Sequence, residues 1–336
     1  MTDRHLLRRA LSISAIAIAL PLWLLTVPLW VVIAVAVDLI GGLRQLPTLR
    51  LLLFFGVYLV HEWVGVIAAT ALWFTGRFGR RLNADRHRRV QAWWATSLLD
   101  WAGGLLGVRL RFDDLSELPD TTFIIFSRHA SMIDAVVPAA LVTGRLERLI
   151  RYVLKKELRW DPNLDLFGGR LCNHFVTRGG DTEAEEAAIE QMATDAPPGA
   201  VLAIFPEGTY STPSTRRRVL ASLERAGEIK ALQRAKRMAT LLPPKPAGAL
   251  AMLRGRPDAD VVIVGHVGLE GVAELKGLRQ RLPLSHPVVI RWWVHRRADL
   301  PTTEEELADW LGQRWLELDR WVGALLTDRG VIKPSR

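Results

Sequence analysis

Two long apolar runs at the start of the chain constrain its fold more than any other feature. Leu11–Ile40 is almost uninterrupted apolar sequence, broken by Pro21 and Pro28, and Leu51–Thr75 is a second run. A helix needs about 20 apolar residues to cross a bilayer, and each run reaches that length. We therefore expect a membrane hairpin over residues 1–76, either as two full spans or as one span plus an interfacial helix.

Positive charge flanks this hairpin on both sides. Arginines occupy the N-terminus and the stretch after the second run, at Arg4, Arg8, Arg9, Arg77, Arg80, Arg81, Arg86, Arg88 and Arg89. Cytoplasmic flanks carry the excess of Lys and Arg, so we expect the rest of the chain on the cytoplasmic side of the cytoplasmic membrane. The net charge of +9 suits an anionic partner. Tryptophans at the ends of apolar runs favour membrane lipid over nucleic acid.

Two features of the membrane-proximal region are open to more than one interpretation. His61 and Glu62 lie inside the second apolar run, where they would be costly facing lipid. One interpretation is that they have an intramembrane function. The other, which we favour because no third ionisable group accompanies them, is that they face the other helix or lie near the headgroups. Residues 77–112 are expected to form interfacial or linking helices, with ordinary amphipathic core packing as the alternative.

From about residue 110 onward, strand-like and helix-like segments alternate. The expected strands are Val108–Phe112, Thr122–Phe126, Leu149–Leu154, His174–Thr177, Ala200–Phe205, Val261–Val267 and Val288–Val294, and the expected helices are Asp134–Val142, Thr182–Thr194, Thr215–Thr240 and Thr303–Leu326. Such alternation is typical of an α/β domain, a sheet covered by helices, which we place at residues 113–336. The single cysteine, Cys172, excludes an intrachain disulfide, and no metal site is expected.

A histidine and an aspartate follow the second of these strands. His129 and Asp134 are five positions apart. If the loop turns into a helix near Ser131, the Asp134 carboxylate can hold the imidazole so that its other nitrogen accepts a proton from a substrate hydroxyl. The alternative is a histidine that caps a helix, with Asp134 as a first-turn acid.

Two further segments carry groups suited to a phosphorylated ligand. Arg178 ends a short strand and is followed by two glycines, an arrangement that suits a phosphate, although it can also pair with Asp181 or Glu183. Downstream, Glu207 and Gly208 lie in a tight turn after another buried strand. Glu207 can accept hydrogen bonds from substrate hydroxyls or from loop amides, and Gly208 allows a ligand to approach the backbone.

In this order, three blocks resemble a known family. His129-x4-Asp134, Phe175 with Arg178, and Phe205-Pro206-Glu207-Gly208-Thr209 are similar to the motifs of the 1-acylglycerol-3-phosphate acyltransferases, the PlsC-like glycerolipid acyltransferases. The resemblance implies that His129 deprotonates a glycerol hydroxyl that attacks an acyl thioester while Asp134 orients the ring. It also implies that Arg178 and Glu207-Gly208-Thr209 hold the phosphate and glycerol. No cofactor is implied; acyl-CoA or acyl carrier protein supplies the acyl chain.

The chain departs from the family pattern in places. Cys172 stands where the second block usually has a glycine, and the segment Leu242–Gly248 resembles the fourth block only loosely. On that basis Lys245 is a candidate phosphate or coenzyme contact, and Ser131 is a further substrate-binding candidate. Tyr152–Lys155 and Glu304–Leu311 resemble the lysocardiolipin acyltransferase branch.

The sequence therefore predicts a membrane-bound acyltransferase that acts on a lysophospholipid, with 1-acyl-sn-glycerol 3-phosphate as the favoured acceptor and a lysocardiolipin-like lipid as the alternative. A lipid esterase is disfavoured because the chain has no Gly-x-Ser-x-Gly motif. A non-catalytic lipid-binding protein built on the basic segment Thr215–Thr240 is a third possibility. The acyl donor, the chain length and the oligomeric state are left open by the sequence.

Overall fold

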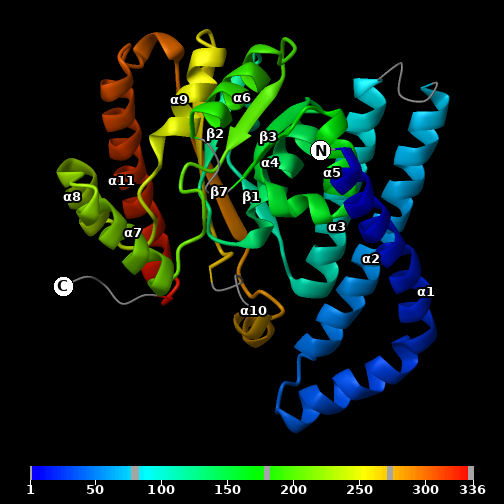
Figure 1. Cartoon of the computed structure of the whole chain (residues 1–336). Coiled ribbons are helices and arrows are strands. Elements are labelled where there is room, and N and C mark those ends of the chain that lie inside the picture. The colour runs from blue at the N-terminus through cyan, green and yellow to red at the C-terminus, as the bar shows by residue number, and fades with distance from the viewer. Residues whose placement is uncertain (1, 77–82, 178–181, 271–274, 332–336) are drawn as a thin grey trace. The chain divides into compact units, whose positions relative to one another are not determined.

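The chain folds into two compact units that do not follow its linear order (Figure 1). The computed structural model describes residues 2–76, 83–177, 182–270 and 275–331. Unit 1 consists of Met1–Arg109, Ala139–Gly180 and Glu274–Pro287, and unit 2 consists of Leu110–Pro138, Asp181–Ala273 and Val288–Arg336. The linear division predicted from the sequence, at residues 76 and 112, differs from this one because residues 139–180 pack with the N-terminal helices.

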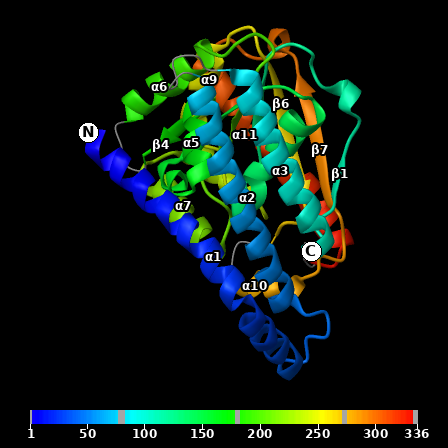
Figure 2. The same cartoon turned by 90° about the vertical axis from the view of Figure 1, so that its right-hand side faces the viewer.

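The predicted hairpin is present in unit 1 as helices α1 (Thr2–Ile40) and α2 (Pro47–Thr75), which pack against each other. By length and composition both are apolar enough to cross a membrane. Helix α1 contains Pro21 and Pro28 and is visibly bent (Figures 1 and 2). A proline cannot donate its backbone hydrogen bond and its ring crowds the preceding turn, which accounts for the bend.

Asp38 closes the hairpin. Its buried carboxylate accepts hydrogen bonds from the backbone N–H groups of Thr48 (2.8 Å) and Leu49 (3.2 Å) and from the Thr48 hydroxyl (2.5 Å). These amides belong to the first turn of α2, where they have no partner within the helix. The one acidic residue at the end of the first apolar run thus caps the second.

Helices α3 (Ala84–Leu106) and α5 (Pro162–Arg170) pack on α2. His61 is buried and contacts the Ser97 hydroxyl at 2.9 Å, and buried Glu62 accepts a hydrogen bond from the indole of Trp94 at 3.1 Å. The pair does face other helices, as we favoured, but the partners come from α3 and α5 and not from α1. The segment expected to be interfacial therefore covers polar groups of α2.

Unit 1 also contains two parallel strands, β3 (Ile150–Lys155) and β4 (His174–Val176), and the short helix α10 (Leu275–Arg281). Between these strands, Cys172 has φ = 61°, a left-handed conformation that glycine adopts without strain. Cys172 therefore occupies a position whose backbone suits the glycine expected from the family resemblance.

Unit 2 holds five strands of the sheet, in the order β1-β7-β6-β2-β5. Its strands are β1 (Leu110–Phe112), β2 (Phe123–Ser127), β5 (Val201–Ile204), β6 (Asp260–Val267) and β7 (Val288–His295). All neighbours run parallel except β6 and β7, which are antiparallel. Strands β2 and β5 are buried along their whole length, as expected for central parallel strands covered on both faces.

Helices α6 (Thr182–Thr194), α9 (Pro246–Gly255) and α11 (Glu304–Asp328) cover this sheet, and α6 and α9 lie side by side (Figure 1). Trp315 of α11 is fully buried. The structure thus confirms the predicted α/β architecture, a sheet covered by helices and preceded by two long apolar helices.

Two predicted helices are wrong in detail. The basic segment Thr215–Thr240 forms two helices, α7 (Pro213–Arg225) and α8 (Ile229–Arg237), because Gly227 takes φ = 69° and ends the first. The segment Asp134–Val142 is not one α-helix: it consists of a 3₁₀ turn Met132–Ala135, the single α-turn α4 (Val136–Ala139) and a π-helical turn Ala140–Arg145. Pro138 lies within this segment and disrupts regular α-helical hydrogen bonding.

Candidate active site

The register of three parallel strands brings the predicted site residues of unit 2 together. Phe126 of β2 lies opposite Ile204 of β5, and Ser127 lies opposite Val264 of β6. The carboxyl ends of these strands therefore meet at one edge of the sheet, where loops carry ligand-binding groups. His129 follows β2 in that position and Glu207 follows β5.

His129 and Asp134 are in direct contact. Nδ1 of His129 donates to Oδ2 of Asp134 at 3.0 Å. The other ring nitrogen, Nε2, has no hydrogen-bond partner among the described residues, and the imidazole side chain retains 13% exposure. This arrangement fixes the tautomer in which Nε2 is the basic nitrogen, as a general base requires.

Asp134 is buried and receives several further hydrogen bonds from its own loop. The backbone N–H groups of Ala130 and Ser131 donate to Oδ2, the latter at 2.6 Å, and the Ser131 hydroxyl donates to Oδ1 at 2.7 Å. Burial alone would raise the pKa of Asp134, but the nearby His266 and the His129 contact outweigh burial and hold it below its usual range. Asp134 is therefore ionised beside the imidazole.

Ser131 has a different position from the one predicted. We expected it to bind substrate, but its side chain is fully buried and its hydroxyl is committed to Asp134. The short loop folds back on itself, so the serine supports the aspartate.

A second histidine, His266, contacts the far side of Asp134. It lies on β6, is fully buried, and has its Nε2 atom 3.5 Å from Oδ1 of Asp134 and 3.3 Å from the carbonyl oxygen of Arg128. Burial lowers the pKa of His266, against the pull of Asp134, which raises it. His266 is not among the residues that the sequence pattern predicts for the site, although a histidine inside an otherwise apolar strand is a signal.

Glu207 connects two loops through backbone amides. It is buried, and its Oε1 accepts from the N–H of His129 at 2.9 Å while its Oε2 accepts from the N–H of Leu242 at 3.0 Å. Of the two partners predicted for Glu207, substrate hydroxyls or loop amides, the structure shows the amides. Burial raises the pKa of Glu207 to about 8, only partly offset by these hydrogen bonds.

The turn that contains Gly208 lies against Lys245. Gly208 is exposed with φ = 67°, and the Nζ atom of Lys245 lies 3.8 Å from the position a Cβ on Gly208 would occupy. The Lys245 backbone N–H donates to the carbonyl oxygen of Pro206 at 2.8 Å. Thr209 is half-buried in the same turn. The structure thus brings Lys245, Gly208 and Thr209 together, close to the Glu207 carboxylate that holds the His129 amide.

An ion pair between Arg128 and Glu270 anchors the loop that carries His129. Arg128 donates to Glu270 at 2.6 Å and to the carbonyl oxygen of His266. Glu270 in turn accepts from the N–H of Gly268 at 2.7 Å. The residue just before the proposed base is therefore anchored to the end of β6.

Arg178, the predicted phosphate ligand, lies outside the described residues. The strand that leads to it, β4, is paired in parallel with β3, with Phe175 opposite Leu154. Among the described residues no group of three or more His, Cys, Asp or Glu side chains is placed to hold a metal ion.

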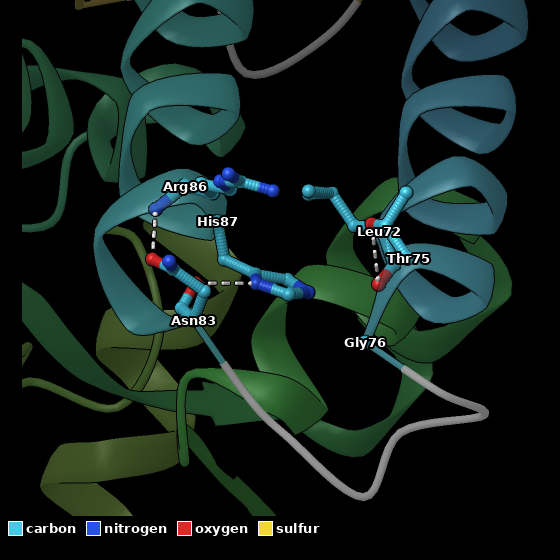
Figure 3. A pocket seen from close by; sticks show the side chains of 6 residues that line it. All are labelled: Leu72, Thr75, Gly76, Asn83, Arg86 and His87. Carbon is cyan, nitrogen blue, oxygen red and sulfur yellow. Dashed lines mark hydrogen bonds between the residues drawn. The ribbon is translucent and has the colours of Figure 1, made fainter.

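Unit 1 contains a small pocket of about 160 Å³ between the end of α2 and the start of α3 (Figure 3). It is lined by Leu72, Thr75, Gly76, Asn83, Arg86 and His87. The side-chain oxygen of Asn83 caps α3 by accepting from the N–H of Arg86 at 3.0 Å. The backbone carbonyl oxygen of Asn83 contacts Nδ1 of His87 at 2.8 Å. None of these residues belongs to the predicted catalytic set.

Comparison with known proteins identifies the domain that carries this geometry. Residues 109–263 match the family model described as acyltransferase. This segment of the chain is an acyltransferase domain. The matched segment includes His129, Asp134 and Glu207, which belong to the motifs that carried the resemblance in the sequence.

Two further comparisons complete the description of this acyltransferase. A solved structure of the 1-acyl-sn-glycerophosphate (LPA) acyltransferase PlsC from Thermotoga maritima is similar over 83% of this chain and 98% of its own, at 17% sequence identity and a TM-score of 0.48. No curated protein matches the sequence significantly.

Proposed function

We propose that this acyltransferase transfers an acyl chain from an acyl thioester to the free hydroxyl of a lysophospholipid, with 1-acyl-sn-glycerol 3-phosphate as acceptor and phosphatidate as product. The observation that carries the proposal is the His129–Asp134 contact at 3.0 Å within the acyltransferase domain, with Nε2 of His129 available to a ligand. The two other acceptor-side groups, Lys245 and the Gly208 turn, suit a phosphorylated molecule.

In the proposed step, Nε2 of His129 accepts the proton of the acceptor hydroxyl. The oxygen then attacks the thioester carbonyl carbon, and a C–O bond forms as the C–S bond breaks. The imidazolium returns the proton to the departing thiolate of coenzyme A or acyl carrier protein. Asp134 stabilises the transient positive charge, as an orienting carboxylate does for a histidine base.

We also propose that α1 and α2 anchor the enzyme in the membrane. Helix α1 exposes large apolar side chains along its length, including Leu25 at 80% and Ile40 at 89%. Apolar surface of this extent is expensive in water and is suited to lipid. The arginine-rich flanks favour a cytoplasmic position for the catalytic domain at the cytoplasmic membrane. An anchored enzyme meets a lipid acceptor directly in the bilayer that contains it.

The direct test is acyl transfer by the purified full chain in lipid or detergent. A panel of lysophospholipids, including lysophosphatidate and lysocardiolipin, is combined with acyl-CoA and acyl carrier protein donors, and products are identified by mass spectrometry. We expect phosphatidate from lysophosphatidate, and a loss of on the order of a hundredfold or more in His129→Ala. The control is His286→Ala, which changes an exposed histidine of unit 1.

Equal rates in wild type and His129→Ala would overturn the mechanism. A product formed only from lysocardiolipin would keep the mechanism and replace the acceptor. Hydrolysis of lipid without acyl transfer would favour the esterase alternative.

A further inference from the structure

Three arginines of unit 1 surround one buried carboxylate. Asp165 on α5 is fully buried, and its Oδ1 lies 2.7 Å from Nη2 of Arg8 while its Oδ2 lies 2.6 Å from Nε of Arg9. Nε of Arg159, from the 3₁₀ turn Lys156–Trp160, lies 3.3 Å from Oδ1. Two segments more than a hundred residues apart thus place guanidinium groups around the same side chain.

The cluster formed by Arg8, Arg9, Arg159 and Asp165 has a surplus of positive charge and of donors. Three guanidinium groups against one carboxylate leave a net charge of two. Each guanidinium carries five N–H donors, more than a single carboxylate can accept. Nε of Arg8 is buried without a hydrogen-bond partner among the described residues. Burial lowers the pKa of Arg159, and repulsion from Arg8 and Arg9 lowers it further against the pull of Asp165.

The arginines remain reachable by a ligand. The side chains of Arg9 and Arg159 are 41% and 25% exposed, whereas that of Asp165 is 1% exposed. The guanidinium of Arg159 lies over the Phe175 ring at 4.6 Å, which orients its plane. A second anion can therefore approach from the solvent side while Asp165 holds the arginines in place from beneath.

Exposed apolar side chains surround the cluster on both contributing segments. Leu6 and Leu7 of α1 are each 61% exposed, and Leu158 and Trp160 beside Arg159 are 37% and 57% exposed. Arginine next to exposed tryptophan and leucine is the pattern of a surface at headgroup depth, where a guanidinium meets phosphate and the apolar groups meet acyl chains. A soluble polyanion does not account for the apolar rim.

We infer that Arg8, Arg9 and Arg159, held by Asp165, form a binding site for the phosphate of an anionic membrane phospholipid. Arginine recognises phosphate through charge-assisted, bidentate hydrogen bonds, and the surplus donors of the cluster supply them. The bound lipid would fix the start of α1 to the turn Lys156–Trp160 and α5. This site is distinct from the catalytic histidine and does not depend on the acyl acceptor.

The test is lipid binding to the full chain in detergent, followed by native mass spectrometry with phosphatidylglycerol and phosphatidylcholine as probes. We expect phosphatidylglycerol to bind more tightly than phosphatidylcholine, and the double variant Arg8→Gln/Arg9→Gln to weaken phosphatidylglycerol binding about tenfold. Asp165→Asn removes the charge that holds the three arginines in place, so we expect it to weaken phosphatidylglycerol binding as well. His129→Ala should bind as wild type does.

The matched control is Arg88→Gln/Arg89→Gln, which removes two arginines that share one aspartate, Asp85, in the first turns of α3. It changes the net charge equally and should leave binding within about twofold of wild type. Thermal unfolding of each variant verifies that it is folded.

Wild-type affinity in folded Arg8→Gln/Arg9→Gln would overturn the inference, as would an equal loss in the control. Wild-type affinity in folded Asp165→Asn would overturn the part of the inference in which Asp165 holds the arginines. Displacement of phosphatidylglycerol by millimolar inorganic phosphate would assign the site to free phosphate and reject the lipid.

Discussion

Asp134 joins more polar partners than its role as an orienter of His129 alone would require. It accepts from the His129 ring and from the backbone and hydroxyl of Ser131, and His266 lies on its far side. A buried carboxylate with this many donors is held in one orientation. The position of the His129 ring therefore follows from the loop and from β6.

Replacing Asp134 by Asn should affect both activity and folding. In wild type, N–H and O–H donors point at both oxygens of Asp134. Asparagine replaces one of these oxygens with an NH₂ group, so the His129 ring is no longer held in its tautomer and orientation. We expect kcat to fall on the order of a hundred to ten-thousandfold, with a lower midpoint of thermal unfolding. Asp120→Asn, an exposed aspartate of unit 2, is the control and should behave as wild type. Unchanged kcat in Asp134→Asn would refute the orienting role.

His266 is predicted to be a positioning residue that acts through Asp134. We expect His266→Ala to lower kcat about tenfold while KM changes less than about twofold, because the substrate contacts are intact. His266→Gln can place an amide N–H near the position of Nε2 and should recover most of the rate. The pH–rate profile should also shift in His266→Ala. A rise in KM without a fall in kcat, or a kcat in His266→Gln as low as that of His266→Ala, would indicate a purely structural role.

Glu207 should make the folded enzyme less stable as the pH rises through about 8. Its pKa is raised to about 8 by burial from an ordinary value of 4.5, so the folded chain keeps a proton that the unfolded chain releases. This contribution is fully present below the ordinary value and is lost as the pH rises through about 8. We expect the midpoint temperature of thermal unfolding to fall between about pH 5 and about pH 9, and to fall more steeply in wild type than in Glu207→Gln. Parallel curves would contradict this assignment.

At the scale of elements, the hairpin depends on a close approach between α1 and α2. A Cβ atom on Gly56 would lie 2.3 Å from ring atoms of Trp23, so α2 can approach α1 only because residue 56 is glycine. The break between α7 and α8 has a similar cause, since Gly227 allows the left-handed turn. Arg216 of α7 then donates to the carbonyl oxygen of Ala235 on α8 at 3.0 Å, which ties the two short helices together.

Gly56→Leu should therefore weaken the hairpin. Overpacking at this contact is expected to cost about 1–3 kcal/mol, measured as a lower thermal unfolding midpoint of the full chain in detergent. Gly104→Ala is the matched control, because a Cβ there meets no atom within 4 Å and alanine is the better helix former. Equal stability of Gly56→Leu and wild type would show that the α1–α2 contact is dispensable.

The charges of the basic helices are partly used within unit 2. Arg234 pairs with Asp309 of α11 at 2.6 Å, and Lys230 lies 3.7 Å from Glu305. Both pairs join α8 to α11. Docking of the remaining cations on anionic lipid stays a prediction.

At the scale of the whole molecule, the two units interleave along the chain. Residues 139–180 supply β3, α5 and β4, which belong with the N-terminal helices, so the acyltransferase segment 109–263 crosses both units. Removing the N-terminal helices would strip the packing surface from residues in the middle of the matched domain.

A chain that begins at Leu110 should therefore fail to fold on its own. We expect it to aggregate or to lack a cooperative thermal transition, because the α2 surface that buries α5 and the α3 surface under residues 140–145 are missing. The measurement is calorimetry and circular dichroism of the truncated and full chains. A cooperative transition together with His129-dependent activity in the truncated chain would show that residues 1–109 serve only as an anchor.

The sequence by itself determined the features that depend on local pattern. The seven strands all appear within two residues of their expected starts, because buried strands read as apolar runs bounded by turns. The two apolar runs became α1 and α2, and Thr303 caps α11 as a helix start signal predicts. His129 and Asp134 were found for the same reason, since their pairing spans only five positions.

Only the tertiary structure decided what depends on contacts distant in sequence. The placement of His266 behind Asp134, the amide partners of Glu207, and the contacts of Arg8 and Arg9 with Asp165 each join residues at least 35 positions apart. Strand register and the packing of residues 139–180 bring them together, and neither is encoded in a local periodicity. The Pro138 and Gly227 interruptions show the same limit on a smaller scale, because one backbone constraint outweighed the helical pattern around it.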